Sequence, residues 1–131
     1  MKKKKDILST LWVFVTLNYL YCDLIGLMDS SLLKQYLTGN VEGLEINEEF
    51  LLYAGILMEI PIAMVLLSKV LRKKANWWAN IAAGSIKTIV MILTLFVGSV
   101  TSYYLFFATI EIATTVFIIW YAARWLRQKE V

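Results

Sequence analysis

Four long apolar stretches dominate the 131-residue sequence, at about residues 7–28, 50–71, 77–97 and 103–125. Each is close to the roughly 20 helical residues that are needed to cross the hydrocarbon core of a bilayer. Within lipid a segment must satisfy its own backbone hydrogen bonds, so each stretch is expected to be a helix. The sequence therefore predicts an all-α fold, a four-transmembrane-helix bundle, with residues 1–131 forming a single integral membrane domain.

The charged residues predict how this bundle lies in the membrane. Eleven of the 13 Lys and Arg residues lie near the chain ends or at the turn between the second and third stretches. The loop of residues 29–49 carries five acidic residues against Lys34 alone. Basic loops stay on the cytoplasmic side of membrane proteins. We therefore expect a multi-pass protein of the cell's inner (cytoplasmic) membrane, with both termini in the cytoplasm and the acidic loop outside.

The outer loop contains a short helical pattern. Ser30 or Ser31 is expected to be its N-cap, and Gly39 is expected to follow its last turn. The apolar side chains on one face predict an amphipathic helix that lies on the membrane surface or covers the helix ends. They are Leu32, Leu33, Tyr36 and Leu37.

Three charged residues interrupt the apolar stretches. At 1.5 Å per residue, Glu59, Lys87 and Glu111 lie about 13, 15 and 12 Å from the ends of their spans, near mid-membrane. Asn18 shares that level, and Asp23 lies nearer the outer surface. A charge at mid-membrane costs about 2.5–3.5 kcal/mol on insertion scales, so these groups are expected to meet inside the bundle. The five residues together are the predicted ligand or proton site.

Polar residues recur at helical spacing in the first, third and fourth stretches, which predicts one inward-facing stripe on each helix. The stripes are Ser9, Trp12, Thr16, Tyr19 and Asp23; Asn80, Gly84, Lys87, Met91 and Thr94; and Tyr104, Ala108, Glu111, Thr115 and Ile118.

Pro61 adds a further polar group to the second stretch. Proline has no backbone N–H and clashes with the carbonyl four residues earlier, here that of Leu57. A helix kink is therefore predicted at Pro61, close to Glu59. Both an ordinary packing kink and a moving hinge agree with this pattern.

The residue types present in the sequence limit the kinds of functional site that we expect. The chain has no His and only Cys22, so no metal site and no cofactor are expected. Lys87 can neutralise one of the two buried glutamates, and the other is expected to hold a shared proton. This pattern favours binding or transport of a small cationic or proton-exchanging ligand. The alternatives are a non-catalytic assembly subunit with a structural Lys–Glu cluster and, ranked last, a membrane enzyme.

The expected partners follow from the same reasoning. The lipid bilayer is one, and a small-molecule ligand is another. A homodimer is expected if the protein transports its ligand, because four spans make a small transporter. The basic residues obey the topology rule, so nucleic-acid binding is not expected.

The sequence also resembles known families. The segments ILSTLWVFVTLNYLYCDLIGLMD, LMEIPIAMVLLSKVL, ANWWANIAAG and YYLFFATIEIATTVFIIWYA are similar to an uncharacterised family of small bacterial four-span membrane proteins, a domain of unknown function. A looser similarity, in Glu59 and Pro61, links the chain to DoxX-like and emopamil-binding-protein-like four-helix bundles. Members of the latter group hold small amphipathic ligands around intramembrane acids. The resemblance supports the architecture and implies no sterol chemistry.

Overall fold

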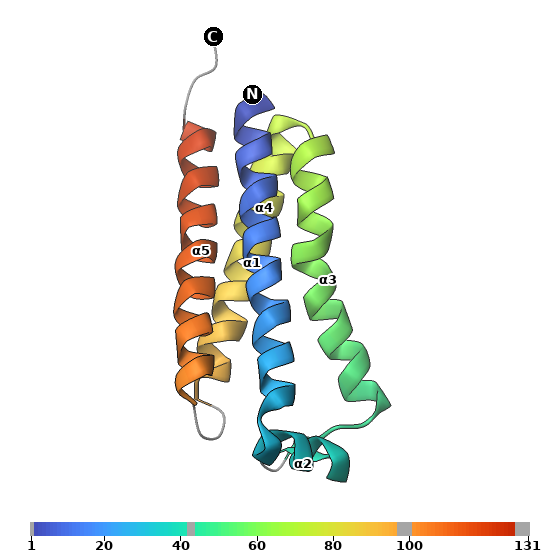
Figure 1. The fold of residues 1–131 in the computed structure, drawn as a ribbon. Coiled ribbons are helices and arrows are strands. Elements are labelled where there is room, and N and C mark those ends of the chain that lie inside the picture. The colour runs from blue at the N-terminus through green and yellow to red at the C-terminus, as the bar shows by residue number, and fades with distance from the viewer. Residues whose placement is uncertain (1, 42–43, 97–100, 128–131) are drawn as a thin grey trace.

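The computed structural model describes residues 2–41, 44–96 and 101–127. Four long helices lie side by side along one axis, and a fifth, short helix crosses one end (Figure 1). The long helices are α1 (Lys2–Met28), α3 (Glu48–Val70), α4 (Lys73–Thr94) and α5 (Ser102–Arg127).

The four long helices form a closed ring of contacts. α1 packs against α3 and α5, and α4 packs against the same two helices. The first turns of α1 and the last turns of α5 lie at one end, and the short helix α2 (Ser30–Thr38) lies at the other (Figure 1). Side chains from all four helices can therefore meet in the interior.

Three of the described helices are long and apolar enough to cross a membrane, namely Lys3–Met28, Glu48–Val70 and Ser102–Trp125. α4 is similar in length but carries several polar residues, Lys87 among them. The all-α prediction is confirmed, and these helices agree with a membrane protein. A fourth span at residues 77–97 stays a prediction.

The N-cap of α2 is Asp29, so the prediction of Ser30 or Ser31 as its N-cap is wrong. The Oδ1 atom of Asp29 accepts hydrogen bonds from the backbone N–H groups of Ser31 at 3.1 Å and Leu32 at 3.4 Å. A carboxylate is also favoured over a hydroxyl at this end of the helix dipole. Gly39 ends the helix in the left-handed conformation, at φ 78°, as predicted.

A short hairpin leads from α2 to α3. Strands β1 (Asn40–Val41) and β2 (Leu44–Glu45) pair antiparallel. Asn47 then caps α3, because its side-chain oxygen accepts the backbone N–H of Phe50 at 2.8 Å. The chain thus leaves the α2 end of the molecule as a helix directed back along α1.

α4 and α5 approach each other closely. A Cβ atom at Gly84 would lie 2.8 Å from Cγ1 of Ile119, so only glycine fits there without a shift. Near the α2 end, the hydroxyl of Tyr104 donates to Oγ1 of Thr94 at 2.6 Å. This packing fixes the α5 stripe against the α4 stripe.

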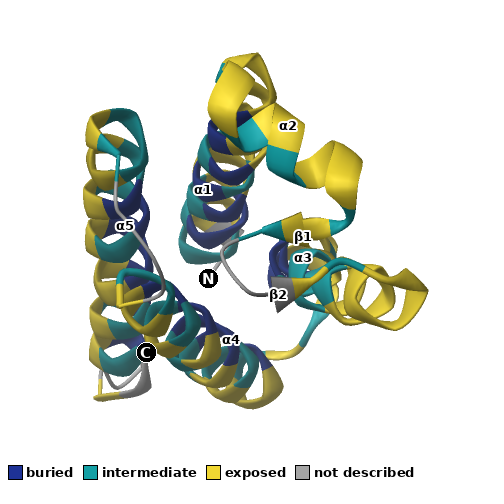
Figure 2. Ribbon diagram, turned by 90° about the horizontal axis from the view of Figure 1, so that it is seen from below, coloured by how far each residue is buried: buried dark blue, intermediate teal, exposed yellow. Residues whose placement is uncertain are grey.

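The inward stripes predicted for α1, α4 and α5 are confirmed in most of their positions. Figure 2 shows buried residues along the inner sides of these helices and exposed residues outside. The exceptions include Asp23, which is exposed. The buried members are Ser9, Trp12 and Tyr19; Asn80, Gly84, Lys87 and Met91; and Ala108, Glu111, Thr115 and Ile118.

Candidate functional site

Lys87 is the centre of the interior polar site. It lies on the inward stripe of α4, and only 3% of its surface is exposed. Its Nζ lies 4.2 Å from the centre of the Tyr19 ring on α1 and 3.5 Å from the carbonyl oxygen of Leu57 on α3. One ammonium group thus contacts two other helices.

The contact with Leu57 depends on Pro61. Within α3 the carbonyl of Leu57 would normally accept the N–H of residue 61, which proline lacks. Lys87 donates to this carbonyl instead. This geometry agrees with the prediction that Pro61 leaves the carbonyl of Leu57 free as a further polar group, and its partner is Lys87.

Glu111 brings a buried carboxylate to the same interior. Its exposed fraction is 1%, and its Oε1 atom has no hydrogen-bond partner among the described residues. One turn along α5, Thr115 accepts a hydrogen bond from Thr88 of α4 at 2.7 Å. The carboxylate therefore lies at the closely packed α4–α5 contact.

An ion pair between Lys87 and a buried glutamate was expected, and among the described residues Lys87 forms no such pair. The Lys87 ammonium contacts a backbone carbonyl and an aromatic face instead. Glu111 lies within electrostatic range of Lys87 but is not hydrogen-bonded to it. The buried carboxylate is therefore left with an oxygen that can accept a proton or a donor group.

Two more polar atoms near this site lack partners among the described residues. They are the hydroxyl groups of Tyr19 and of Thr16, one turn apart on α1. A buried polar group without a hydrogen bond costs about 1–3 kcal/mol. Together with Oε1 of Glu111, these are three buried polar atoms whose hydrogen bonding is not satisfied by the described residues.

Asp23 and Asn18 lie at the margin of the site. Asp23 is exposed, one turn beyond Tyr19 toward α2, and its charge acts on Lys87 and Glu111. The side chain of Asn18 donates to the carbonyl of Phe14 in its own helix at 2.9 Å. Asp23 therefore extends the site toward the α2 end, whereas Asn18 is turned to its own backbone.

Glu59 was expected in the buried cluster, and this prediction is wrong. Its side chain is exposed on the outer side of α3. The inner side of α3 carries Pro61, Met64 and Ser68, all buried. Glu59 is two residues from Pro61, a rotation of about 200° around a helix with 3.6 residues per turn, which turns it away from the interior.

A second buried polar network, which was not predicted from the sequence, lies nearer the chain ends. Asn80 accepts a hydrogen bond from the indole N–H of Trp12 at 2.7 Å and donates to Oδ1 of Asn76 at 2.6 Å. Asn76 in turn donates to the carbonyl of Ser68 at 2.7 Å. The spacing of Asn76, Asn80 and Lys87 could have revealed it, because all three share one face of α4.

Among the described residues, no group of three or more His, Cys, Asp or Glu side chains is placed so that it could hold a metal ion.

The comparisons with known proteins agree with the expected uncharacterised family. A family model described as a family of unknown function (DUF6326) matches residues 1–131. No curated protein and no solved structure matches the chain. The similarity to DoxX-like and emopamil-binding-protein-like bundles stays a prediction.

Proposed function

The chain belongs to DUF6326, a family of unknown function, and from its geometry we propose an integral membrane protein that binds or transports a small cationic or proton-exchanging ligand. The proposed site comprises Glu111, Lys87 and Tyr19, with Asp23 on its outer side. The observation that carries the proposal is the buried Glu111 carboxylate, whose Oε1 has no partner among the described residues.

A fourth span at α4 is part of this proposal. The outward residues Trp78, Ile86 and Ile89 are apolar and 56, 44 and 57% exposed, whereas Asn80 and Lys87 are buried. The polar residues therefore lower the hydropathy of α4 without facing lipid. Its 22 residues would extend about 33 Å at 1.5 Å per residue, enough for a core of about 30 Å.

The orientation proposed for these spans places both chain termini in the cytoplasm and α2 outside, in the inner membrane. Support comes from the charges at the two ends of the helices. Lys69, Arg72, Lys73 and Lys74 lie at the α3–α4 turn, and Glu45, Glu48 and Glu49 lie near the start of α3. The basic end is the one expected to stay inside.

The chemistry of the site supports a proton or a cation as its ligand. A carboxylate in a low-dielectric interior is stabilised by a proton or by a cationic group, since either removes an uncompensated charge. Asp23 is exposed, whereas Glu111 is buried. A proton or a small cation entering from the α2 end would thus meet Asp23 first.

Infrared difference spectroscopy between acidic and alkaline buffer tests the proposal. We expect a carboxyl C=O band that responds to pH, disappears in Glu111→Gln and persists in Glu59→Gln. Both substitutions remove one charge and preserve side-chain size, so Glu59→Gln is the matched control. Absence of any band specific to Glu111, in variants that elute like the wild type in gel filtration, would exclude proton exchange there.

A second candidate is a non-catalytic assembly subunit. The contacts of Lys87 with Leu57 and Tyr19 favour it, because they join three helices and need no ligand. This candidate predicts that Glu111→Gln leaves the pH-dependent infrared spectrum unchanged and that the protein co-purifies with another membrane protein.

A further inference from the structure

Glu59 places an exposed carboxyl group in the middle of an apolar helix, α3. None of the other described residues forms a hydrogen bond or an ion pair with its side chain. The charged residues toward the two ends of α3, Glu49 and Lys69, are each ten residues away, which is about 15 Å at 1.5 Å per residue. In a hydrocarbon core of about 30 Å, Glu59 therefore lies near mid-membrane. A carboxyl group at that depth is costly unless another polar group meets it.

The surface of α3 around Glu59 is suited to contact with another helix. Gly55, one turn before Glu59, is exposed, and a Cβ atom placed on it would meet no atom within 4 Å. Ala63, one turn after Glu59, is also small. Small residues let membrane helices approach closely, so that a polar side chain between them can reach a partner. The same surface carries exposed apolar side chains, namely Leu52, Ile56, Ile62 and Leu66.

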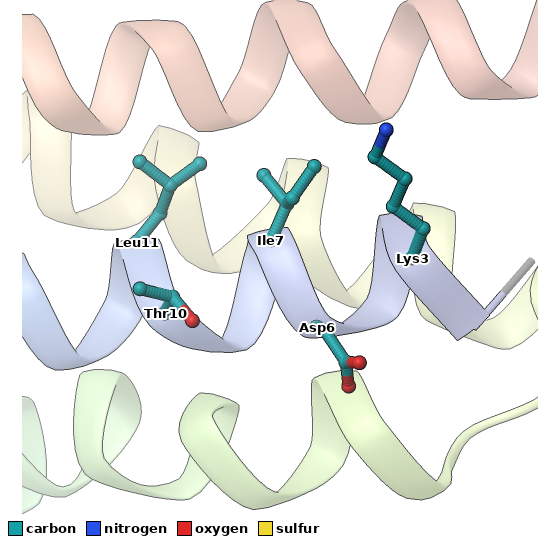
Figure 3. Close-up of a pocket in the computed structure, with 5 residues that line it drawn as sticks. All are labelled: Lys3, Asp6, Ile7, Thr10 and Leu11. Carbon is teal, nitrogen blue, oxygen red and sulfur yellow. The ribbon is translucent and has the colours of Figure 1, made fainter.

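A second copy of the chain fits this surface better than a small ligand does. Figure 3 shows a pocket on α1, and Glu59 is not among the residues that line it, which are Lys3, Asp6, Ile7, Thr10 and Leu11. Among the described residues, the other charged groups near mid-membrane are Lys87 and Glu111, and both are buried. A second copy thus offers no exposed cation at this depth, and the ionisable group that it can bring to Glu59 is its own Glu59.

We propose that α3 forms the interface of a symmetric homodimer in the membrane, in which the Glu59 side chains of the two copies contact each other. A neutral carboxyl group carries both a hydrogen-bond donor and an acceptor. Two such groups are therefore self-complementary across a twofold axis, as an interface between identical surfaces requires. The proposal depends on α3 crossing the membrane, but it uses neither Lys87 nor Glu111, so it and the proposed ligand site can fail separately.

Fluorescence energy transfer between donor-labelled and acceptor-labelled full chains in phosphatidylcholine vesicles measures the dimer. The labels are attached at Lys34→Cys in a Cys22→Ala background, which has no other cysteine. We expect energy transfer that falls as the chains are diluted with lipid. Glu59→Leu should raise the dissociation constant of the dimer by about fivefold to thirtyfold, the effect of a polar contact between membrane helices in model peptides. Glu59→Gln should retain the dimer, because an amide also carries a donor and an acceptor.

Thr109→Val is the matched control, since it removes a polar group from an exposed residue within α5. It should leave the dissociation constant unchanged. Energy transfer no greater than that of random encounters at every dilution would overturn the proposal. A dissociation constant that Glu59→Leu leaves unchanged, or that Thr109→Val raises equally, would overturn it as well.

Disulfide cross-linking locates the contact on the molecule. In the Cys22→Ala background, Ile62→Cys lies one turn from Glu59 and should form a covalent dimer on oxidation in the membrane. Val116→Cys on α5 should not, although the native side chains at the two positions are similarly exposed, at 47 and 48%. Cross-linking through Val116→Cys but not through Ile62→Cys would place the contact on α5 and show that the α3 assignment is wrong.

Discussion

At the residue scale, Lys87 shows how an ammonium group can be held in an apolar interior by neutral groups. The face of Tyr19 and the carbonyl of Leu57 lie 4.2 and 3.5 Å from its Nζ, respectively. A desolvated cation–π contact contributes about 2 kcal/mol. This neutral environment leaves Glu111 available for another partner, which is the basis of the proposed site.

The two charged residues Lys87 and Glu59 should respond very differently to substitution. Lys87→Met removes the donor to Leu57 and leaves a buried carbonyl unpaired, so we expect a loss of about 1–3 kcal/mol in the free energy of unfolding. Glu59→Gln should stay within about 0.5 kcal/mol, as is usual for exposed positions. Thermal unfolding in one detergent measures both variants. A large loss in Glu59→Gln would contradict the exposed position of that side chain.

At the element scale, α3 is the helix whose inward-facing side was predicted wrongly from the sequence. In α1, α4 and α5 the polar residues mark the inward side, because the exposed side is apolar. Between its charged ends α3 is apolar nearly all round, and the one charged residue of that stretch, Glu59, is exposed. Pro61 and Ser68, seven residues apart, mark the inner side instead. Helix faces could thus be predicted in three helices, whereas the buried partners of Lys87 depend on packing that no single helix encodes.

Two glycines provide a test of the helix packing. Gly84→Ala would place a methyl group 2.8 Å from Cγ1 of Ile119, whereas at Gly55 no atom lies within 4 Å. Overpacking typically costs about 1–3 kcal/mol, so Gly84→Ala should lower the unfolding temperature. Gly55→Ala should raise it slightly, because alanine is favoured over glycine in helices by about 0.5–1 kcal/mol. Equal effects of the two variants would contradict the close α4–α5 contact.

At the scale of the whole molecule, the two ends of the helices differ in charge and in the side chains they present. The end with the α3–α4 turn carries Lys69, Arg72, Lys73 and Lys74. The α2 end carries Asp29, which caps α2 and accepts a hydrogen bond from Tyr103 of α5 at 3.1 Å. This difference in charge between the two ends favours the proposed orientation, in which the basic end lies in the cytoplasm.

Cysteine labelling measures the proposed topology directly. In a Cys22→Ala background, which lacks any other cysteine, Lys34→Cys and Ser102→Cys should react with an impermeant maleimide added to intact cells. Lys74→Cys should react only after permeabilisation. All three positions are exposed. Labelling of Ser102→Cys together with Lys74→Cys would show that α4 does not cross the membrane.

The ammonium of Lys87 also has a mechanical consequence. It holds the carbonyl that Pro61 leaves free, midway along α3, and the half of α3 near α2 leans away from α1 (Figure 1). The same ammonium is the nearest buried cation to Glu111. A shift of Lys87 toward the ionised carboxylate would release the carbonyl and loosen α3 at its weakest turn. The ionisation of Glu111 and the bend of α3 would in that case be coupled through one side chain.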